Sequence, residues 1–233
     1  MSVRLSLLDA FDLTCDGEHV ALQQSAQRLL AFVALHPRPL QRAYVAGALW
    51  PDLPEERAQG SLRSALWRVR REGCCVVTGD DGRLGLHSAV EVDARELIDL
   101  AHSVLDDSRD LPSTATSDLI ALSGDLLPDC YDEWVLLERE HFRQLRLHAL
   151  EVLCDRLVEA GRFGAASEAA LAVVAADPLR ESAHRALIRV HLAEGNLGEA
   201  LRQYAFFRRL SEQQLGLGPS PEMEHLIAPV TPR

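Results

Sequence analysis

The sequence contains no lysine, and all 24 of its basic residues are arginine. Without lysine the chain cannot form the phosphate-binding loop Gly-x-x-x-x-Gly-Lys-Ser/Thr, which excludes the nucleotide hydrolases that use it. A Gly-x-Ser-x-Gly nucleophile elbow and a His-Glu-x-x-His zinc motif are also absent. No apolar run approaches the roughly 18 residues of a membrane-spanning helix, and the N-terminus has no apolar signal segment. We therefore expect a cytoplasmic protein that is not an enzyme and has no membrane partner.

The five cysteines show no metal-binding spacing. Their number is odd, Cys74 and Cys75 are adjacent, and no Cys-x-x-Cys pair occurs. This pattern indicates reduced thiols rather than zinc ligands. His184 and His191 lie seven residues apart, but histidines at this spacing more often pack between helices than bind a metal. We expect neither a metal nor a cofactor.

The whole chain has a formal net charge of −11, and most of this negative charge lies in its C-terminal part. Residues 1–95 hold 11 arginines and 12 acids, whereas residues 96–233 hold 13 arginines and 23 acids. An acidic protein does not coat nucleic acid non-specifically, so any contact with DNA must be confined to a local basic patch.

One such patch covers residues 57–71, which contain five arginines and no acid. On a helix at about 100° per residue, five residues form a narrow apolar face: Ala58, Leu62, Ala65, Leu66 and Val69. The opposite face and its edges carry arginine, serine and one tryptophan, which suits insertion into a DNA major groove. Composition alone fits a solvated surface helix equally well. The neighbouring elements decide between these interpretations.

The elements around this helix predict a winged helix. Apolar alternation predicts three short strands within residues 3–22, with a hairpin turn at Asp16-Gly17. A helix capped by Ser25 follows, then a short helix that stops at Trp50-Pro51. After the basic helix, residues 74–78 and 83–87 read as a hairpin, which would be the wing.

These residues resemble a known family. The N-terminal sheet before three helices, with Leu62-Arg63 and Val69-Arg70-Arg71 on the third, is similar to the OmpR-type winged helix. The ending Ala48-Leu49-Trp50-Pro51 of the second helix resembles the version in antibiotic regulatory proteins of the SARP/AfsR group.

The C-terminal part has an internal period of 34 residues, which is the tetratricopeptide period. Five pairs share this offset: Leu145 and Leu179, Ala149 and Ala183, Leu153 and Leu187, Gly161 and Gly195, Ala166 and Ala200. The two glycines fall where each repeat must turn between its helices, and Asp177-Pro178 separates the repeats. The period predicts a stack of helix pairs with a surface for a partner.

This part also resembles the bacterial transcriptional activator domain that follows the winged helix in SARP regulators. The resemblance lies in residues 127–134 (LPDCYDEW), 177–181 (DPLRE), 195–201 (GNLGEAL), Tyr204 and 215–220 (LGLGPS). We expect a mainly α fold with a small β component. A winged helix-turn-helix domain would span residues 1–92, and a tetratricopeptide-like repeat domain 93–233. Asp93 and Glu96 have the spacing of a capping box at the second domain's first helix.

The predicted function is sequence-specific binding of double-stranded DNA. The candidate residues are Arg42, Arg57, Ser61, Arg63, Ser64, Trp67, Arg68, Arg71 and Arg83. Arg68 and Arg71 are the candidates for reading bases. Arg42, at a helix N-terminus, is placed for a phosphate, and Arg83, at the wing tip, for the minor groove.

The resemblance further implies a bacterial activator that binds promoter direct repeats as side-by-side dimers. It also implies contact with RNA polymerase or its sigma factor, in control of a secondary-metabolite or similar pathway. Two other classes stay open at this point. The winged helix could serve as a docking surface of a protein-interaction scaffold, which the acidic charge favours. Alternatively, the repeats could form a small-molecule sensor.

Overall fold

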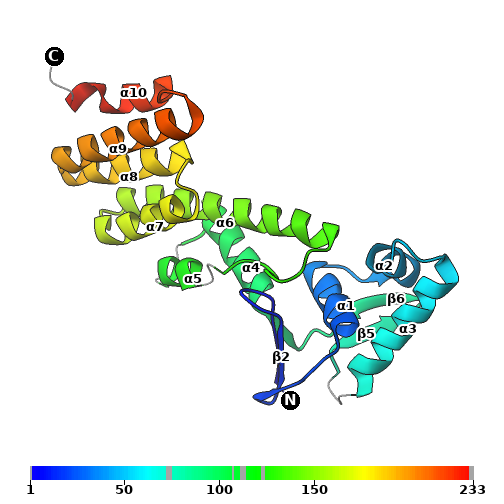
Figure 1. The fold of residues 1–233 in the computed structure, drawn as a ribbon. Coiled ribbons are helices and arrows are strands. Elements are labelled where there is room, and N and C mark those ends of the chain that lie inside the picture. Colours follow the sequence, from blue (N-terminus) through cyan, green and yellow to red (C-terminus); the bar gives the residue numbers. More distant parts are fainter. Residues whose placement is uncertain (1, 72–74, 107, 111–113, 122–123, 231–233) are drawn as a thin grey trace. The chain divides into compact units, whose positions relative to one another are not determined.

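The computed structural model describes residues 2–71, 75–106, 108–110, 114–121 and 124–230. The chain divides into two compact units (Figure 1). The N-terminal unit comprises Met1–Ile98 and Leu122–Phe142, and the repeat unit comprises Asp99–Ala121 and Arg143–Arg233. The fold is mainly helical with a small β component, as the sequence predicted. No helix in the described part is long and apolar enough to cross a membrane.

The N-terminal unit begins with a sheet in the order β3-β2-β1-β7. Its strands are β1 (Val3–Ser6), β2 (Asp12–Cys15), β3 (Glu18–His19) and β7 (Val90–Val92). β1 runs antiparallel to β2 and parallel to β7. Asp16 and Gly17 have φ angles of 50° and 86°, which a two-residue hairpin turn requires. The first two predicted strands and the turn are confirmed, whereas the third, predicted at Val20 and Leu22, lies earlier, at Glu18–His19.

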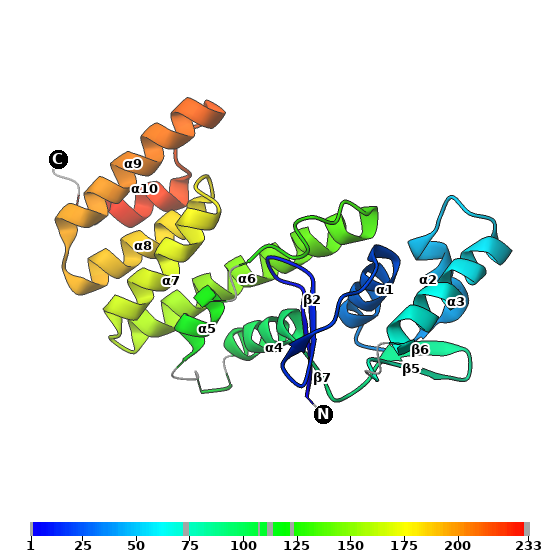
Figure 2. The same ribbon diagram turned by 60° about the horizontal axis from the view of Figure 1, so that its bottom comes forward.

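Three helices, the short strand β4 and a hairpin form the rest of the winged helix. They are α1 (Gln24–Leu35), β4 (Leu40–Gln41), α2 (Arg42–Leu49), α3 (Glu55–Arg71), β5 (Val77–Asp80) and β6 (Arg83–Leu86). α1 packs against α3 and β6, and β6 lies between β4 and β5 in a second sheet. Figure 2 shows the β5–β6 hairpin below α3. α1 begins one residue before Ser25, after the N-cap Gln23, so the cap predicted for Ser25 is wrong. Residue 74 of the predicted hairpin lies outside the described residues.

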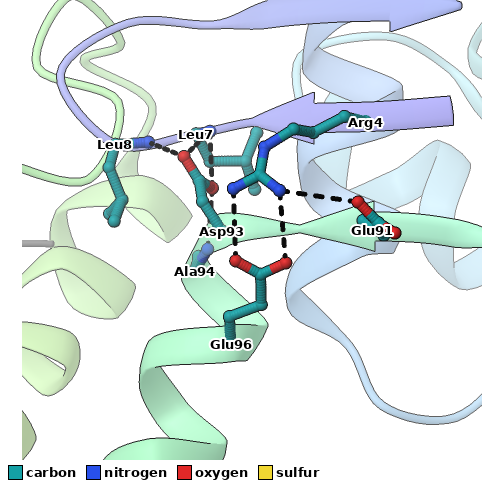
Figure 3. A network of polar contacts seen from close by, with 7 residues as sticks. All are labelled: Arg4, Leu7, Leu8, Glu91, Asp93, Ala94 and Glu96. Atoms are coloured by element: carbon teal, nitrogen blue, oxygen red, sulfur yellow. Dashed lines mark hydrogen bonds and ion pairs between the residues drawn. The ribbon is translucent and has the colours of Figure 1, made fainter. Parts of the chain in front are cut away.

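Asp93 joins the end of β1 to the start of α4 (Asp93–Leu105), as Figure 3 shows. Its buried carboxylate accepts hydrogen bonds from the backbone N–H of Leu7 at 2.9 and 3.1 Å and from that of Leu8 at 3.2 Å. It also accepts from the N–H of the next residue in α4 at 2.7 Å. Glu96 pairs with Arg4 instead, at 3.2 Å. The predicted capping box is therefore wrong, because Glu96 pairs with Arg4 on β1 and the Asp93 carboxylate binds the N–H groups of Leu7 and Leu8, just after β1.

A segment from much later in the chain completes the N-terminal unit. Leu126 forms an antiparallel bridge with Leu8, and the Leu127 N–H donates to the Leu7 carbonyl at 2.8 Å. The Arg139 guanidinium, on α6 (Glu133–Glu159), donates to the Leu126 carbonyl at 2.8 Å. The predicted division at residue 92 makes each domain one continuous segment, whereas each compact unit contains two segments of the chain. The division at residue 92 as a boundary between functional domains stays a prediction.

The repeat unit is a series of packed helices. Besides the ends of α4 and α6 it contains α5 (Ala115–Ala121), α7 (Phe163–Ala176), α8 (Glu181–Glu194), α9 (Leu197–Leu215), α10 (Pro221–Ile227) and η1 (Ala228–Val230). α8 packs against α7, α9 and α10. Gly161 and Gly195 have φ angles of 68° and 83° and lie at the turn within each repeat, as predicted.

Positions related by the 34-residue period mostly share their burial. Three pairs are no more than 3% exposed: Ala149 and Ala183, Leu153 and Leu187, Ala166 and Ala200. Leu179 differs, because 36% of it is exposed, so the pair with Leu145 is not part of the core. Charges follow the period too. Arg189 and Asp155, 34 residues apart, form an ion pair at 2.8 Å between α8 and α6.

His184 is fully buried between α8 and α9. Its Nε2 lies 2.9 Å from the Pro178 carbonyl oxygen, its Nδ1 lies 2.6 Å from the Gln203 side-chain nitrogen, and its ring packs on Phe207. Burial lowers the pKa of the imidazole. This packing confirms the interpretation of His184 as a residue of a helix interface. Among the described residues no cluster of side chains is arranged to hold a metal.

The cysteines depart in part from expectation. Cys15 is disulfide-bonded, so the prediction of reduced thiols is wrong for this residue. Cys75, Cys130 and Cys154 are free thiols. Burial raises the pKa of Cys154 to about 12, which keeps this thiol neutral.

Candidate DNA-binding surface

α3 buries one stripe and exposes the opposite face. The five residues predicted for the buried stripe are each no more than 5% exposed: Ala58, Leu62, Ala65, Leu66 and Val69. α3 packs on α1 and α2. The contacts of this stripe fix the rotation of the helix and therefore decide which side chains point outwards.

The predicted DNA-binding residues of α3 whose side chains are described lie on its outer face and at its edges. Four are exposed: Arg57, Arg63, Ser64 and Trp67. Two are half-buried: Ser61 and Arg68. Trp67 is 60% exposed, which is unusual for an aromatic side chain of this size. Arg71 is the last residue of α3, and its side chain lies outside the described residues.

A hollow of about 570 Å³ lies beside α3, against the start of α1 and the turn between α2 and α3. It is lined by Ser25, Trp50, Leu53, Arg57, Gly60, Ser61, Ser64 and Arg68. The Arg68 Nη1 donates to the Ser25 hydroxyl at 3.1 Å, which holds the guanidinium at this edge of α3. The hollow thus brings together four predicted residues, whereas Arg63 and Trp67 do not line it.

The two remaining candidates lie close together at the hairpin turn. Arg42 is the first residue of α2, and its N–H donates to the Gly82 carbonyl at 3.0 Å. Arg83 begins β6 and pairs with Gln41, the neighbour of Arg42 in sequence. The wing tip and the start of α2 therefore form one basic corner rather than two separate contacts.

Sequence reasoning missed Ser25 on this surface, and Tyr44 and Arg28 on the two helices that pack against α3. Ser25 was expected to cap α1, but it binds Arg68 instead. Tyr44 on α2 is 55% exposed, with its ring 6.0 Å from that of Phe32. Arg28 binds the carbonyl oxygen at the end of α2. Only the exposed tyrosine could have been found from the sequence, by its place on the polar side of α2.

A second hollow of the N-terminal unit, of about 220 Å³, lies between α1 and residues 127–130. Its wall includes Phe11, Arg28, Leu127 and Cys130. Burial, followed by the charge of nearby Asp132, raises the pKa of the Cys130 thiol, so this thiol is not an activated nucleophile. The volume is below the roughly 300 Å³ at which small-molecule sites usually begin.

The chemistry offered by α3 is that of hydrogen-bond donation to anions and base edges. Guanidinium groups donate in a planar fork that matches phosphate oxygens and the acceptor edge of guanine. Serine hydroxyls add short donors around the hollow. α1 has no acid in its first turn, so its N-terminal N–H groups keep the local field positive there.

The sequence profile of the bacterial transcriptional activator domain matches residues 92–230. The chain belongs to this family. It is a transcriptional regulator of the SARP type, and the family is in general one of regulators rather than enzymes.

Two curated relatives of this regulator are called Regulatory protein AfsR. The protein of Streptomyces coelicolor is 28% identical over 97% of the chain, and that of Streptomyces griseus is 26% identical over 87%. The chain spans about a quarter of their length, 24% and 22% respectively.

The fold of this regulator is similar to that of a solved structure, Mycobacterium tuberculosis EmbR in complex with a low-affinity phosphopeptide. The TM-score is 0.76 at 20% sequence identity, over 98% of this chain and 64% of the other. At this identity the likeness describes the fold alone.

Proposed function

We propose that this regulator binds double-stranded DNA sequence-specifically and activates transcription by recruiting RNA polymerase or its sigma factor in the bacterial cytoplasm. The observation that carries the proposal is the outer face of α3. Residues 57–71 combine five arginines with no acid in a chain of net charge −11. A surface of this kind in an otherwise acidic protein favours a confined contact with a polyanion.

Within this proposal, different parts of the surface contact the phosphate backbone of the DNA and recognise its bases. Arg57, Ser61, Ser64 and Arg68 surround one hollow and would hold a phosphate of the DNA backbone. Arg68 was expected to read a base, but its bond to Ser25 favours a positional role.

The rest of the surface would read bases and extend the contact. Arg63, Trp67 and Arg71 would face base edges in the major groove. Arg42 and Arg83 would contact the backbone and the adjacent minor groove at the basic corner.

The two parts of the chain would divide the work. Residues 96–233 hold 13 arginines and 23 acids, so bare DNA repels them, and stacked helices present a protein-sized surface. The family's description as an activator domain supports contact with the transcription machinery. Side-by-side dimers on direct repeats complete the proposal, in which the protein performs no catalysis.

The competing function is a protein-interaction scaffold, which the net charge of −11 favours. Titration with DNA flanking the chain's own gene, at several salt concentrations, separates the two. Each phosphate contact contributes a slope of about −0.9 to the plot of log K against log salt. A steep slope, together with tighter binding to this DNA than to random DNA, supports the proposal. Flat, weak binding to both would leave the scaffold as the better account.

A further inference from the structure

Arg28 of α1 lies at the centre of a chain of contacts that leads to the helix-turn-helix. Its Nε and Nη2 bind the two carboxylate oxygens of Asp132 at 2.5 and 3.0 Å. The same Nη2 donates to the carbonyl oxygen of Leu49 at 2.8 Å. Both charged side chains are about three-quarters buried, with 23% and 27% exposed. An ion pair with this bidentate geometry and burial is stronger than a surface pair.

The contact with Leu49 falls at a structurally sensitive point. Leu49 is the last residue of α2, where helix carbonyls lack partners and a cation is favoured. The turn that leads into α3 follows directly. It is held by two further bonds, from Trp50 N–H to the Ala46 carbonyl at 3.0 Å and from Leu53 N–H to the Trp50 carbonyl at 3.2 Å. Trp50 and Leu53 also line the hollow beside α3.

Asp132 is itself held firmly by its segment. Its carbonyl oxygen accepts the N–H of Val135 at 2.9 Å in the first turn of α6. Trp134, two residues after Asp132, packs edge-on against Phe32 of α1, and the centroids of the two rings are 5.0 Å apart. Arg139 donates to the Cys130 carbonyl at 3.0 Å and so shapes the loop before Asp132. These contacts hold the backbone at Asp132, and its carboxylate binds Arg28.

We infer that Asp132 is a positioning residue for DNA recognition, acting through Arg28 on the end of α2 and the turn into α3. This inference rests on the proposed DNA binding. Without the carboxylate, the guanidinium is free to turn away from Leu49, and the turn that sets α3 against the DNA loosens. The segment that carries Asp132 belongs by sequence to the activator domain, since the family profile spans 92–230.

Simple electrostatics predicts the opposite result, which makes the inference testable. Removing one negative charge from a chain of net charge −11 should strengthen its attraction to DNA. If Asp132 positions the turn, its removal should weaken specific binding instead.

The test compares Asp132→Asn with Asp129→Asn in the full chain, using a DNA fragment that the wild type binds specifically. Asp129 is an exposed acid of the same segment, so both variants change the charge equally. We expect Asp132→Asn to weaken specific binding by roughly three- to tenfold and Asp129→Asn to leave it unchanged or slightly tighter. Binding to random DNA should change little in either. Equal effects of the two variants on specific binding would overturn the inference.

A double-mutant cycle shows whether Arg28 and Asp132 act together, even if one substitution alone weakens DNA binding for another reason. Arg28→Lys retains the charge but cannot bind Asp132 and Leu49 in the same geometry. Its loss of specific binding should resemble that of Asp132→Asn, and the double variant should be no worse than either. Losses that add would show that the two residues do not act as one unit, which contradicts the inference.

Amide hydrogen exchange tests the positioning without DNA. In Asp132→Asn the N–H groups of Trp50 and Leu53 should exchange faster than in the wild type, while those of Asp129→Asn should not. Unchanged exchange refutes the positioning role even if DNA binding is established. If the Trp50 and Leu53 amides exchange faster in Asp132→Asn but the wild type binds no DNA, the proposed function is refuted. The positioning of the turn by Asp132 and Arg28 would then still hold.

Discussion

Replacing Asp93 by alanine should destabilise the N-terminal unit by about 3–5 kcal/mol. Asp93 is 6% exposed, and its carboxylate accepts hydrogen bonds from three backbone N–H groups. The Leu7 donor is buried, and a buried donor without a partner costs about 1–3 kcal/mol. The Leu8 donor is partly buried, so water can replace much of its bond and its loss adds about 1 kcal/mol. Losing the bond to the N–H of the next residue in α4 adds about 1 kcal/mol.

Tryptophan fluorescence during urea unfolding measures this effect. The three tryptophans, at positions 50, 67 and 134, all lie in the N-terminal unit, so their signal reports that unit and not the repeats. Glu96→Ala is the matched control from the same network (Figure 3). Its ion pair with Arg4 joins side chains that are both 44% exposed, and such pairs contribute about 0–1 kcal/mol. If Asp93→Ala shifts the free energy of unfolding no more than Glu96→Ala does, the reasoning from buried donors is wrong.

Three further predictions concern α3, the repeats and the domain boundary. Leu66→Ala should cost roughly 2–5 kcal/mol in urea unfolding. Arg63→Ala should leave unfolding unchanged but lose about 1–3 kcal/mol of discrimination at one base pair, measured on single-base operator variants. Because burial lowers the pKa of His184 in the folded state, the unfolded chain takes up a proton first as the pH falls. The repeat unit should therefore lose stability below about pH 6.5, and His184→Gln should remove that pH dependence in thermal unfolding followed by circular dichroism. In gel-shift assays a fragment of residues 1–142 should retain DNA binding, whereas one of residues 1–98 should lose most of it.

Features set by local chemistry were predictable from the sequence. Asp16 and Gly17 tolerate the positive φ angles of the hairpin turn, and Gly161 and Gly195 do the same within the repeats. The apolar stripe of α3 follows from spacing alone, because an α-helix places every third or fourth residue on one face. The direction of the outer arginine face is then fixed by geometry.

Side chains with both a local and a distant partner were not predictable. Ser25 and Asp93 are of residue types that commonly cap helices, and the sequence assigned them that role. In the structure Ser25 binds Arg68, 43 residues away, and Asp93 binds Leu7, 86 residues away. For a hydroxyl or carboxylate near a helix start, the sequence predicts partners that are close in sequence. Partners from other elements can be identified only in the folded structure, and so can the hollow that Ser25 and Arg68 line.

The same reasoning explains why the extent of the N-terminal unit could not be found from the sequence. The 34-residue period predicts the helices of the repeats, but it carries no information on what α6, which bears Trp134, covers. The ion pair between Asp132 and Arg28 spans 104 residues, and the buried Phe32 takes one of its ring contacts from Trp134. A cut near residue 92 would remove both partners at once, exposing the apolar ring and leaving the guanidinium without its carboxylate. The N-terminal compact unit therefore extends to Phe142, even though the family profile begins at residue 92.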